Sequence, residues 1–275
     1  MLKKLTYFLI FAVISTPSLA KRDKNILLKL GNKEQIGEEI AIEFDNRDLG
    51  FKTQSAKMEM VLKNAYGQEN RRQMESRTFE RPQRDIGDKS LLIFFSPKDI
   101  NGTALLSHAN ILDPDNQWLY LPSLKRVKRI SSKNKSGPFV GSEFAYEDIT
   151  GNEIGKYSWQ FDKIETCPNN KKWQCYKLIS KPKYKHSGYT KRLVWADIEE
   201  LRLDQIEFYD RKGAKFKTQT NRNYKQYLGE YWRADNWYMV NHQNNKKTEL
   251  IFKDYQFNKG LKERDFTKAA LKRIR

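Results

Sequence analysis

The sequence predicts a mainly β protein with helices (α+β), built on a strongly curved antiparallel sheet of about ten strands that forms an open half-barrel covered by helices. From about residue 50 onward, apolar and polar residues alternate in short runs separated by turn formers. Aromatic residues make up 13% of the chain and favour strands with two faces to cover. No linker or repeat divides the 275 residues, so we expect one domain.

Residues 1–20 have the pattern of a secretory signal peptide. Lys3 and Lys4 precede an apolar run from Leu5 to Ile14, and Ser18-Leu19-Ala20 forms a small-x-small cleavage site. An uncleaved anchor is the weaker alternative, because the run is shorter than the ~20 residues of a membrane-spanning helix. We therefore expect cleavage after Ala20, export to the periplasm and a mature single domain of residues 21–275.

The net charge of +18 would ordinarily suggest a nucleic acid partner, because clustered Lys and Arg release counterions from phosphates. Export argues against that partner, and removal of residues 1–20 lowers the charge only by two. Outside the cytoplasm, lipid head groups and envelope glycans are the available polyanions. The charge therefore indicates contact with a membrane surface or an acidic partner.

The elements can be placed in order from their periods. Apolar residues between 21 and 48 recur at helical spacing, which predicts an amphipathic helix lying on the sheet. Leu91–Phe95 is apolar on both faces and ends before Pro97, as expected of a central strand. A short helix is expected at 266–274. Strand-like runs occur at 57–63, 71–79, 91–95, 103–112, 118–121, 157–162, 173–179, 191–196, 201–209, 216–220, 224–232, 237–242 and 248–257, and we expect them to form a meander of ten or so strands.

The two cysteines agree with export. Cys167 and Cys175 bracket a turn-rich segment between two strand-like runs, which favours a disulfide that closes a hairpin. Closing so short a loop should stabilise the fold by roughly 2 to 3 kcal/mol. A metal pair is the weaker alternative, because no His or further Cys lies nearby in the sequence.

The sequence offers little for catalysis. His108, His186 and His242 have no ligand-like spacing, and no nucleophile elbow, zinc-binding helix or phosphate loop occurs. Glu143, Glu147 and Asp148 could in principle serve as acid and base. We interpret them as solvated acids at a helix start, because Ser142 can cap the turn that Glu143 begins. We therefore expect no enzyme, no catalytic or metal-binding residue and no cofactor.

The stretch from Trp118 to Asp148 places apolar residues beside a cationic strip and then a glycine-jointed loop. This combination suits holding an amphiphile better than breaking a bond. The strip could be a solvated edge strand, since edge strands use Lys for protection, or a site for an anionic head group. Its cations are Lys125, Arg126, Lys128 and Arg129.

Three motifs resemble the outer-membrane lipoprotein-sorting protein family, which has a LolA-like fold. They are Asn101–Leu106, Tyr120–Ile130 and Gly141–Asp148, and the resemblance spans most of the mature chain. It implies a half-barrel of antiparallel strands closed by helices, with a hydrophobic cavity that takes acyl chains of lipids or lipoproteins. It also implies a link to inner-membrane exporters of the resistance-nodulation-division (RND) type.

The resulting hypothesis is a non-enzymatic, monomeric periplasmic carrier that takes lipid or lipoprotein cargo between an inner-membrane transporter and an outer-membrane acceptor. The strip would receive the head group or dock on a partner. The segment 137–148 would form a lid, with Gly137, Phe139, Gly141, Phe144 and Tyr146. The expected cavity residues are Met58, Met60, Phe94, Trp118, Tyr120, Leu121 and Trp159.

A non-enzymatic adaptor is the alternative function. In that case the strip would bind an RND-type exporter or another acidic component of the envelope, and the core would be packed without a cavity.

Overall fold

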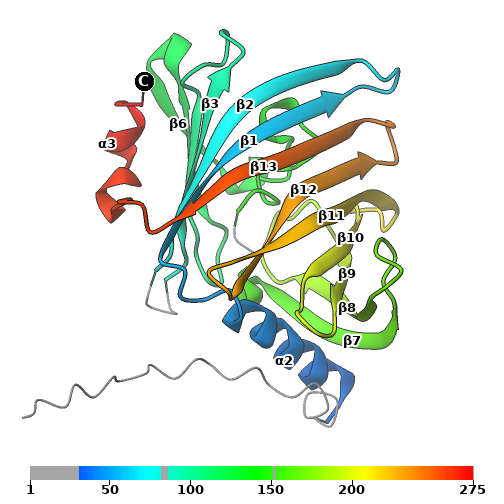
Figure 1. Cartoon of the computed structure of the whole chain (residues 1–275). Helices are drawn as coiled ribbons and strands as arrows, with labels where there is room; N and C mark the ends of the chain where they lie inside the picture. Colours follow the sequence, from blue (N-terminus) through cyan, green and yellow to red (C-terminus); the bar gives the residue numbers. More distant parts are fainter. Residues whose placement is uncertain (1–30, 82–85, 151–152, 275) are drawn as a thin grey trace, which may run out of the picture.

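A single antiparallel sheet of thirteen strands makes up most of the computed structural model, which describes residues 31–81, 86–150 and 153–274 (Figure 1). The predicted signal peptide and the first part of the predicted N-terminal helix lie outside the described residues. The strands are β1 (Thr53–Lys63), β2 (Glu69–Phe79), β3 (Lys89–Ser96), β4 (Ala104–His108), β5 (Asn116–Leu121), β6 (Arg126–Ile130), β7 (Tyr157–Thr166), β8 (Gln174–Pro182), β9 (Lys191–Asp197), β10 (Leu203–Tyr209), β11 (Lys215–Tyr227), β12 (Tyr231–Asn241) and β13 (Lys247–Phe257).

Two meanders make up this sheet. Its strand order is β6-β5-β4-β3-β2-β1-β13-β12-β11-β10-β9-β8-β7, so the first and last strands of the chain pair at its centre. The edges are β6 and β7, and residues 131–156 connect them. The prediction of an open, antiparallel, mainly β fold is confirmed, whereas the single meander of about ten strands is wrong. Alternation within the chain gives strand positions but not the pairing of distant strands.

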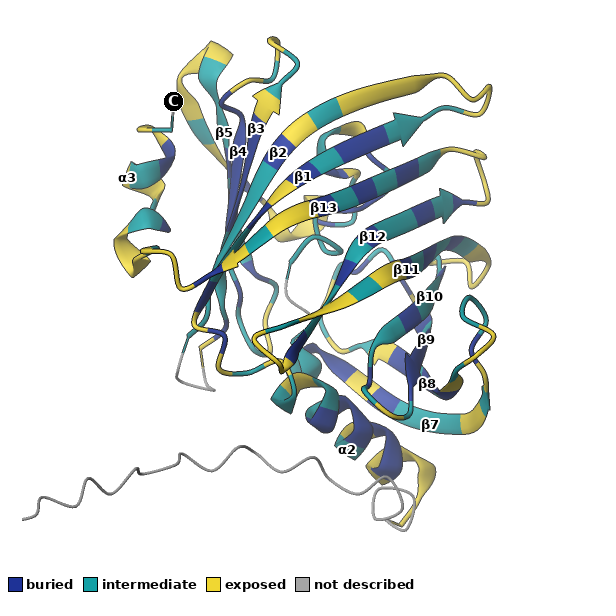
Figure 2. Cartoon of the chain, viewed as in Figure 1, coloured by how far each residue is buried: buried dark blue, intermediate teal, exposed yellow. Residues whose placement is uncertain are grey.

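Strands β1 and β3 show how alternation builds the sheet's two faces. Met58 and Met60 of β1 point into the concave side with Phe94 of β3, while Leu91 and Ile93 of β3 point to the convex side. Burial alternates along β1 from Ala56 to Met60, whereas four consecutive residues of β3, at 91–94, are buried (Figure 2). β3 is thus covered on both faces, as its sequence predicts. The concave residues form the inner cluster: Ala56, Met58, Met60, Met74, Leu92, Phe94, Leu105, Leu119, Ile130, Phe139, Phe144, Tyr189, Phe208, Met239, Leu250 and Phe252.

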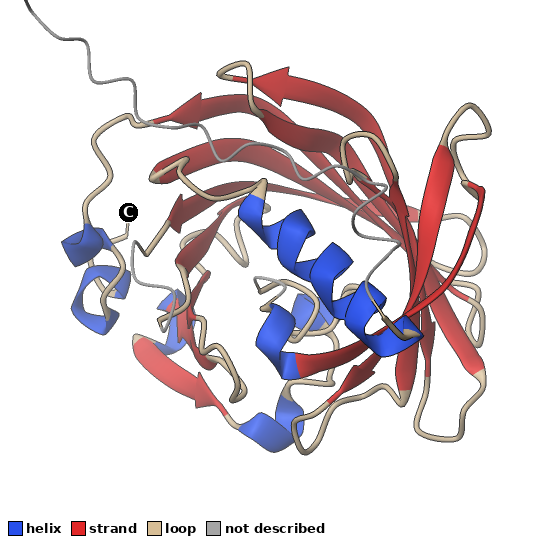
Figure 3. Ribbon diagram, turned by 90° about the horizontal axis from the view of Figure 1, so that it is seen from below, coloured by secondary structure: helices blue, strands red, loops and turns tan. Residues whose placement is uncertain are grey.

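Two helices flank the sheet on opposite sides. α2 (Lys33–Asn46) lies across one end of the concave side, as the view from below shows (Figure 3). α3 (Lys268–Leu271) lies on the convex side, where Phe266 and Leu271 are fully buried against β3 and β4. Helices therefore cover only one end of the concave face, which differs from the expectation that helices cover that face. Within the described residues, no helix combines the length and apolar character needed to span a membrane.

A capping box begins α2. The Asn32 side chain accepts a hydrogen bond from the Gln35 amide at 3.0 Å, and the Gln35 side chain accepts one from the Asn32 amide at 3.1 Å. Ile36 and Ile40 are then buried against β7, β8 and β9. With their partners they form the helix cluster: Ile36, Ile40, Ala41, Tyr157, Trp159, Tyr176, Leu178, Val194 and Leu201.

Cys167 and Cys175 form the predicted disulfide across the β7–β8 hairpin. Both are fully buried with Trp195. The two cysteines therefore close a hairpin rather than bind a metal.

Gly37 allows α2 to approach β7, and this contact can be tested. A Cβ at this position would lie 2.6 Å from the backbone of Gln160 and Phe161. Gly→Ala inside a helix normally stabilises it by about 1 kcal/mol. We expect Gly37→Ala to destabilise the protein instead, by about 1 to 3 kcal/mol, because the helix must move away from the strand. Chemical denaturation measures this.

Glu38→Ala is the matched control, because Glu38 is exposed on the same helix. We expect it to change stability by less than about 0.5 kcal/mol. An increase in the stability of Gly37→Ala would contradict close helix–strand packing.

Candidate functional site

A cavity of about 980 Å³ lies between α2 and the concave face of the sheet. Its walls come from α2 and from strands of both meanders, and its size falls within the usual range of small-molecule sites. Its apolar lining includes Ile40, Phe44, Met58, Leu92, Ile149, Trp159, Leu178, Val194, Leu203, Ile206, Phe208, Trp237, Leu250, Phe252 and Tyr255.

The cavity separates two hydrophobic clusters. The inner cluster supplies Met58, Leu250 and Phe252, and the helix cluster supplies Ile40 and Val194. The Ile206 side chain of β10 packs against both clusters and lines the cavity between them. The sheet is therefore filled on one part of its concave side and hollow on another.

The chain from residue 131 to 156, here called the crossing segment, explains this division. It connects edge strand β6 to edge strand β7, and its described residues are 131–150 and 153–156. Phe139 and Phe144 are fully buried in the inner cluster, and their backbones are joined by the Phe139 amide donating to the Phe144 carbonyl at 2.7 Å. Residues 147–150 then border the cavity. The crossing segment thus packs against one half of the concave face through Phe139 and Phe144, and it forms one wall of the cavity, here called the floor, through residues 147–150.

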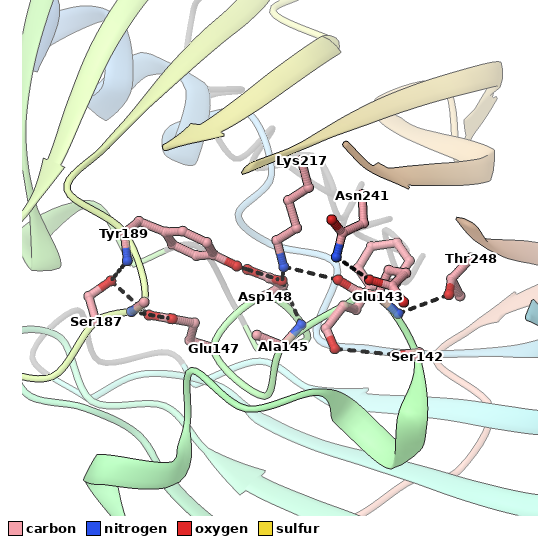
Figure 4. A network of polar contacts seen from close by, with 12 residues as sticks. Ser142, Glu143, Ala145, Glu147, Asp148, Ser187, Tyr189, Lys217, Asn241 and Thr248 are labelled. Atoms are coloured by element: carbon pink, nitrogen blue, oxygen red, sulfur yellow. Dashed lines mark hydrogen bonds and ion pairs between the residues drawn. The ribbon is translucent and has the colours of Figure 1, made fainter. Parts of the chain in front are cut away.

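A buried ion pair fixes the crossing segment to the opposite meander (Figure 4). Lys217 Nζ of β11 lies 2.7 Å from Asp148 Oδ2 and donates to the Glu143 carbonyl at 3.0 Å. The side chains of Lys217 and Asp148 are only 2% and 3% exposed. Asp148 also accepts hydrogen bonds from the Ala145 amide at 2.6 Å and the Tyr189 hydroxyl at 2.9 Å. Every charge in this pair is therefore compensated, as burial requires.

The carboxylates of Glu147 and Glu143, which also belong to the crossing segment, accept hydrogen bonds from other parts of the chain. Glu147 accepts hydrogen bonds from the Tyr184 hydroxyl at 2.6 Å, the Ser187 hydroxyl at 2.9 Å and the Gly188 amide at 2.8 Å. The Asn241 amide donates to the Glu143 carboxylate at 2.6 Å. Burial raises the pKa of Glu147 above its usual value, and the adjacent Asp148 carboxylate adds to this effect. The expectation that these acids are solvated at a helix start is wrong.

Asp115, in the β4–β5 turn, joins the two ends of the crossing segment. Lys135 donates to the Asp115 carbonyl, and Lys156 forms an ion pair with its carboxylate. Both lysines are buried. Burial lowers the pKa of Lys135 to about 8, because the charged form loses hydration. Both ends of the segment thus converge on one turn.

Two arginines of the cavity wall have guanidinium groups stacked on aromatic rings, and that of Arg202 also forms an ion pair with Asp197 at 2.8 Å. The Arg192 guanidinium lies 3.7 Å from the Tyr157 ring centre and donates to Ser180 Oγ at 3.0 Å. The Arg202 guanidinium lies between two tryptophans, 3.9 Å from Trp173 and 4.6 Å from Trp232. Such stacking keeps a cation close to apolar surface at a reduced cost of desolvation.

Comparison with known proteins identifies the family. A family model described as "Uncharacterized protein" matches residues 87–273. A search of the curated proteins found no match. An outer membrane lipoprotein-sorting protein domain of known structure from Vibrio parahaemolyticus is 50% identical, with a TM-score of 0.82, over 86% of this chain and 98% of that one. The chain belongs to the outer membrane lipoprotein-sorting protein family.

Two more distant structures share the fold of this lipoprotein-sorting family member. A DUF1329 family protein from Desulfovibrio piger is 22% identical with a TM-score of 0.81, over 88% of this chain and all of its own. A LolA superfamily protein from Nitrosomonas europaea is 19% identical with a TM-score of 0.67, over 85% of this chain and 98% of its own. The thirteen-stranded open sheet is therefore LolA-like.

The seven residues expected to line a cavity lie in three places in this family member. Met58 and Trp159 line the cavity beneath α2. Met60 and Phe94 are buried in the inner cluster, and Leu121 packs against it. Trp118 and Tyr120 point to the convex face with α3. The alternation of β5 places Trp118 and Tyr120 on the face opposite to Leu119 and Leu121.

The predicted head-group residues and the predicted lid residues lie in different parts of the structure. Lys125 follows a short turn, and Arg126, Lys128 and Arg129 lie on edge strand β6; all four are exposed and none lines the cavity. The residues of the expected lid belong to the crossing segment. Phe139 and Phe144 are buried there, Gly137, Gly141 and Tyr146 lie between or beside them, and the Tyr146 ring is 5.5 Å from that of Phe139. Phe139 and Phe144 are packed in the inner cluster, and only residues 147 and 148 of the expected lid border the cavity, as part of its wall.

Sequence reasoning missed Lys217, Arg192 and Arg202. Each occurs in a strand-like run with other polar residues. In such a run the sequence around a buried cation looks the same as the sequence around a solvent-exposed one. Among the described residues, Cys167, Cys175 and Asp204 have atoms close enough to share a metal ion, but the two sulfurs are joined to each other. The Asp204 carboxylate instead accepts the Asn169 and Asn170 amides at 2.8 and 2.9 Å.

The Lys217–Asp148 pair provides a test of how the crossing segment is held. Lys217→Met should cost about 3 to 5 kcal/mol of unfolding free energy, because it leaves a buried carboxylate without its cation. Adding Asp148→Asn should restore part of that loss by removing the uncompensated charge. Denaturation of both single variants and the double variant measures the coupling. Additive losses would show that the two residues do not stabilise each other.

Asp88, which lines the cavity, should make stability depend on pH. Burial raises its pKa to about 6, although the Arg81 amide donates to its carboxylate at 2.9 Å. A carboxyl with a raised pKa holds its proton more tightly when folded, so this contribution to stability is complete below about pH 4 and is lost as the pH rises through about 6.

We therefore expect the wild type to lose about 1 to 3 kcal/mol relative to Asp88→Asn between pH 4 and 7. Unfolding free energies at several pH values measure this difference. Asp113→Asn, at an exposed position, controls for general charge effects. A difference between wild type and Asp88→Asn that stays constant with pH would contradict the raised pKa.

Proposed function

We propose that this protein is a periplasmic, non-enzymatic carrier that holds the acyl chains of a lipid or lipoprotein in the cavity beneath α2. The observation that supports this most is the 980 Å³ cavity bordered by two apolar clusters. Its relative from Vibrio parahaemolyticus is a lipoprotein-sorting protein domain, which favours the same class of cargo. Export by the predicted signal peptide would place the carrier between the two membranes.

The energetics suit an acyl chain. Burying about fourteen methylenes at ~0.8 kcal/mol each gives a gross gain of ~11 kcal/mol. Loss of translational and chain freedom reduces this value substantially. A micromolar affinity corresponds to about 8 kcal/mol of net binding free energy, so it would require essentially the whole chain to be buried. The flexible thioether of Met58 suits chains of different shape.

Filling the cavity tests this proposal. Ile206→Trp adds bulk between the two clusters, and we expect it to weaken binding of a fluorescent fatty acid at least tenfold. Ile164→Trp is the matched control, because Ile164 is 40% exposed on β7 and does not line the cavity. Fluorescence titration measures affinity, and thermal melting shows whether each variant is folded.

Native mass spectrometry of protein isolated from its own envelope gives an independent readout. We expect a bound species with the mass of a lipid or an acylated peptide. A wild-type protein that carries no such species and binds no fatty acid would overturn the carrier proposal. Unchanged binding by folded Ile206→Trp would place the acyl chain elsewhere.

A further inference from the structure

Exposed cations from two distant segments meet on the convex side of the molecule. One segment comprises β6 and the turn before it, and the other is the C-terminal segment with α3 (Figure 1). Neither segment lines the cavity. We call this surface the basic face, and its exposed cations are Lys125, Arg129, Lys268, Lys272 and Arg273. Arg126 and Lys128 lie on the other face of β6, because they are the register partners of Leu121 and Leu119.

Trp118 joins the two segments into one surface. It is the register partner of Arg129 across β5 and β6, and Lys268 Nζ lies 5.4 Å from its ring centre. Val127 of β6 and Leu271 of α3 belong to the same apolar cluster beneath these cations. The basic face therefore rests on packed structure and is not a set of unrelated side chains.

Acidic residues do not neutralise the basic face. Residues 122–135 and 266–274 contain no Asp or Glu. Within the described parts of the chain, none of these five cations forms an ion pair. By contrast, exposed cations elsewhere, such as Lys57 and Lys225, pair with carboxylates at 2.9 and 2.6 Å. The positive potential at the basic face is thus retained.

Apolar groups accompany these charges. Leu124 is 61% exposed directly before Lys125, and Trp118 and Tyr120 are only half-buried. Cations beside an exposed aliphatic residue and amphipathic aromatic rings are typical of surfaces that meet lipid head groups. Charged side chains along edge strand β6 also disfavour addition of a strand from another protein.

The cavity border beside the C-terminal end of α2, here called the cavity mouth, carries paired charges. Arg47 forms an ion pair with Glu43, and Arg233 forms one with Asp48. An anionic surface would therefore attract the basic face more strongly than this end of the molecule.

We propose that the basic face docks on an anionic phospholipid bilayer and leaves the cavity mouth free for exchange. Each Lys or Arg near an anionic membrane contributes about 1 kcal/mol, or about a factor of five in partitioning. Reversing two of the five cations should therefore weaken binding by about thirtyfold or more. The proposal does not depend on what the cavity holds.

Vesicle co-sedimentation provides the test, using the full mature chain. We expect binding to vesicles of phosphatidylcholine with 30% phosphatidylglycerol, no binding to pure phosphatidylcholine, and strong weakening by salt. Lys125→Glu with Arg129→Glu, and separately Lys272→Glu with Arg273→Glu, should each weaken partitioning about thirtyfold.

Lys171→Glu with Lys172→Glu is the matched control, because it changes the net charge equally at two exposed lysines of the disulfide loop. We expect this control to bind within about threefold of the wild type. Thermal melting confirms that each variant is folded, and all of them should bind a fluorescent fatty acid as the wild type does. The vesicle result therefore stands apart from the carrier test.

Three outcomes would overturn the docking proposal. The wild type could ignore anionic vesicles, or the control pair could lose as much binding as the basic-face pairs. The wild type could also bind an acidic polypeptide such as polyglutamate through these cations while leaving vesicles unbound, which would indicate a protein partner instead.

Discussion

The buried ion pair between Lys217 and Asp148 is the interaction on which the arrangement of the concave side depends. An open sheet of thirteen strands has two distant edges, and the chain must travel from β6 to β7 through apolar surroundings. Polar groups carried along that path have to find partners, because an unpaired buried charge costs several kcal/mol. Lys217 and Tyr189 supply those partners from the far meander, so the crossing segment is fixed in position.

The position of the crossing segment determines where open space remains. Phe139 and Phe144 fill the concave side near β1 to β5, whereas α2 is held over β7 to β9 by its buried isoleucines. The cavity lies between the crossing segment and α2, and Glu147 and Asp148 line it. Packing and polar satisfaction therefore both shape the cavity, and a change in either should alter what it can hold.

Most of the strands, the disulfide and the family could be predicted from sequence, because alternation, turn residues and motifs are local. Pairing between β1 and β13 could not be, since nothing local specifies a partner at the other end of the chain. The acids Glu143, Glu147 and Asp148 were assigned to solvent for the same reason: their partners come from β11, β12 and the β8–β9 connection. Trp118 and Tyr120 were assigned to the cavity from composition, although the face of β5 they occupy depends on register.

The pairing of β1 with β13 also bears on how the chain folds. The two strands at the centre of the sheet come from opposite ends of the sequence, so each meander has an unpaired inner edge until the whole chain is available. Non-local pairings of this kind form slowly, and exposed strand edges invite association with other chains in the meantime. During synthesis, the N-terminal meander would therefore be the segment most in need of protection by a chaperone.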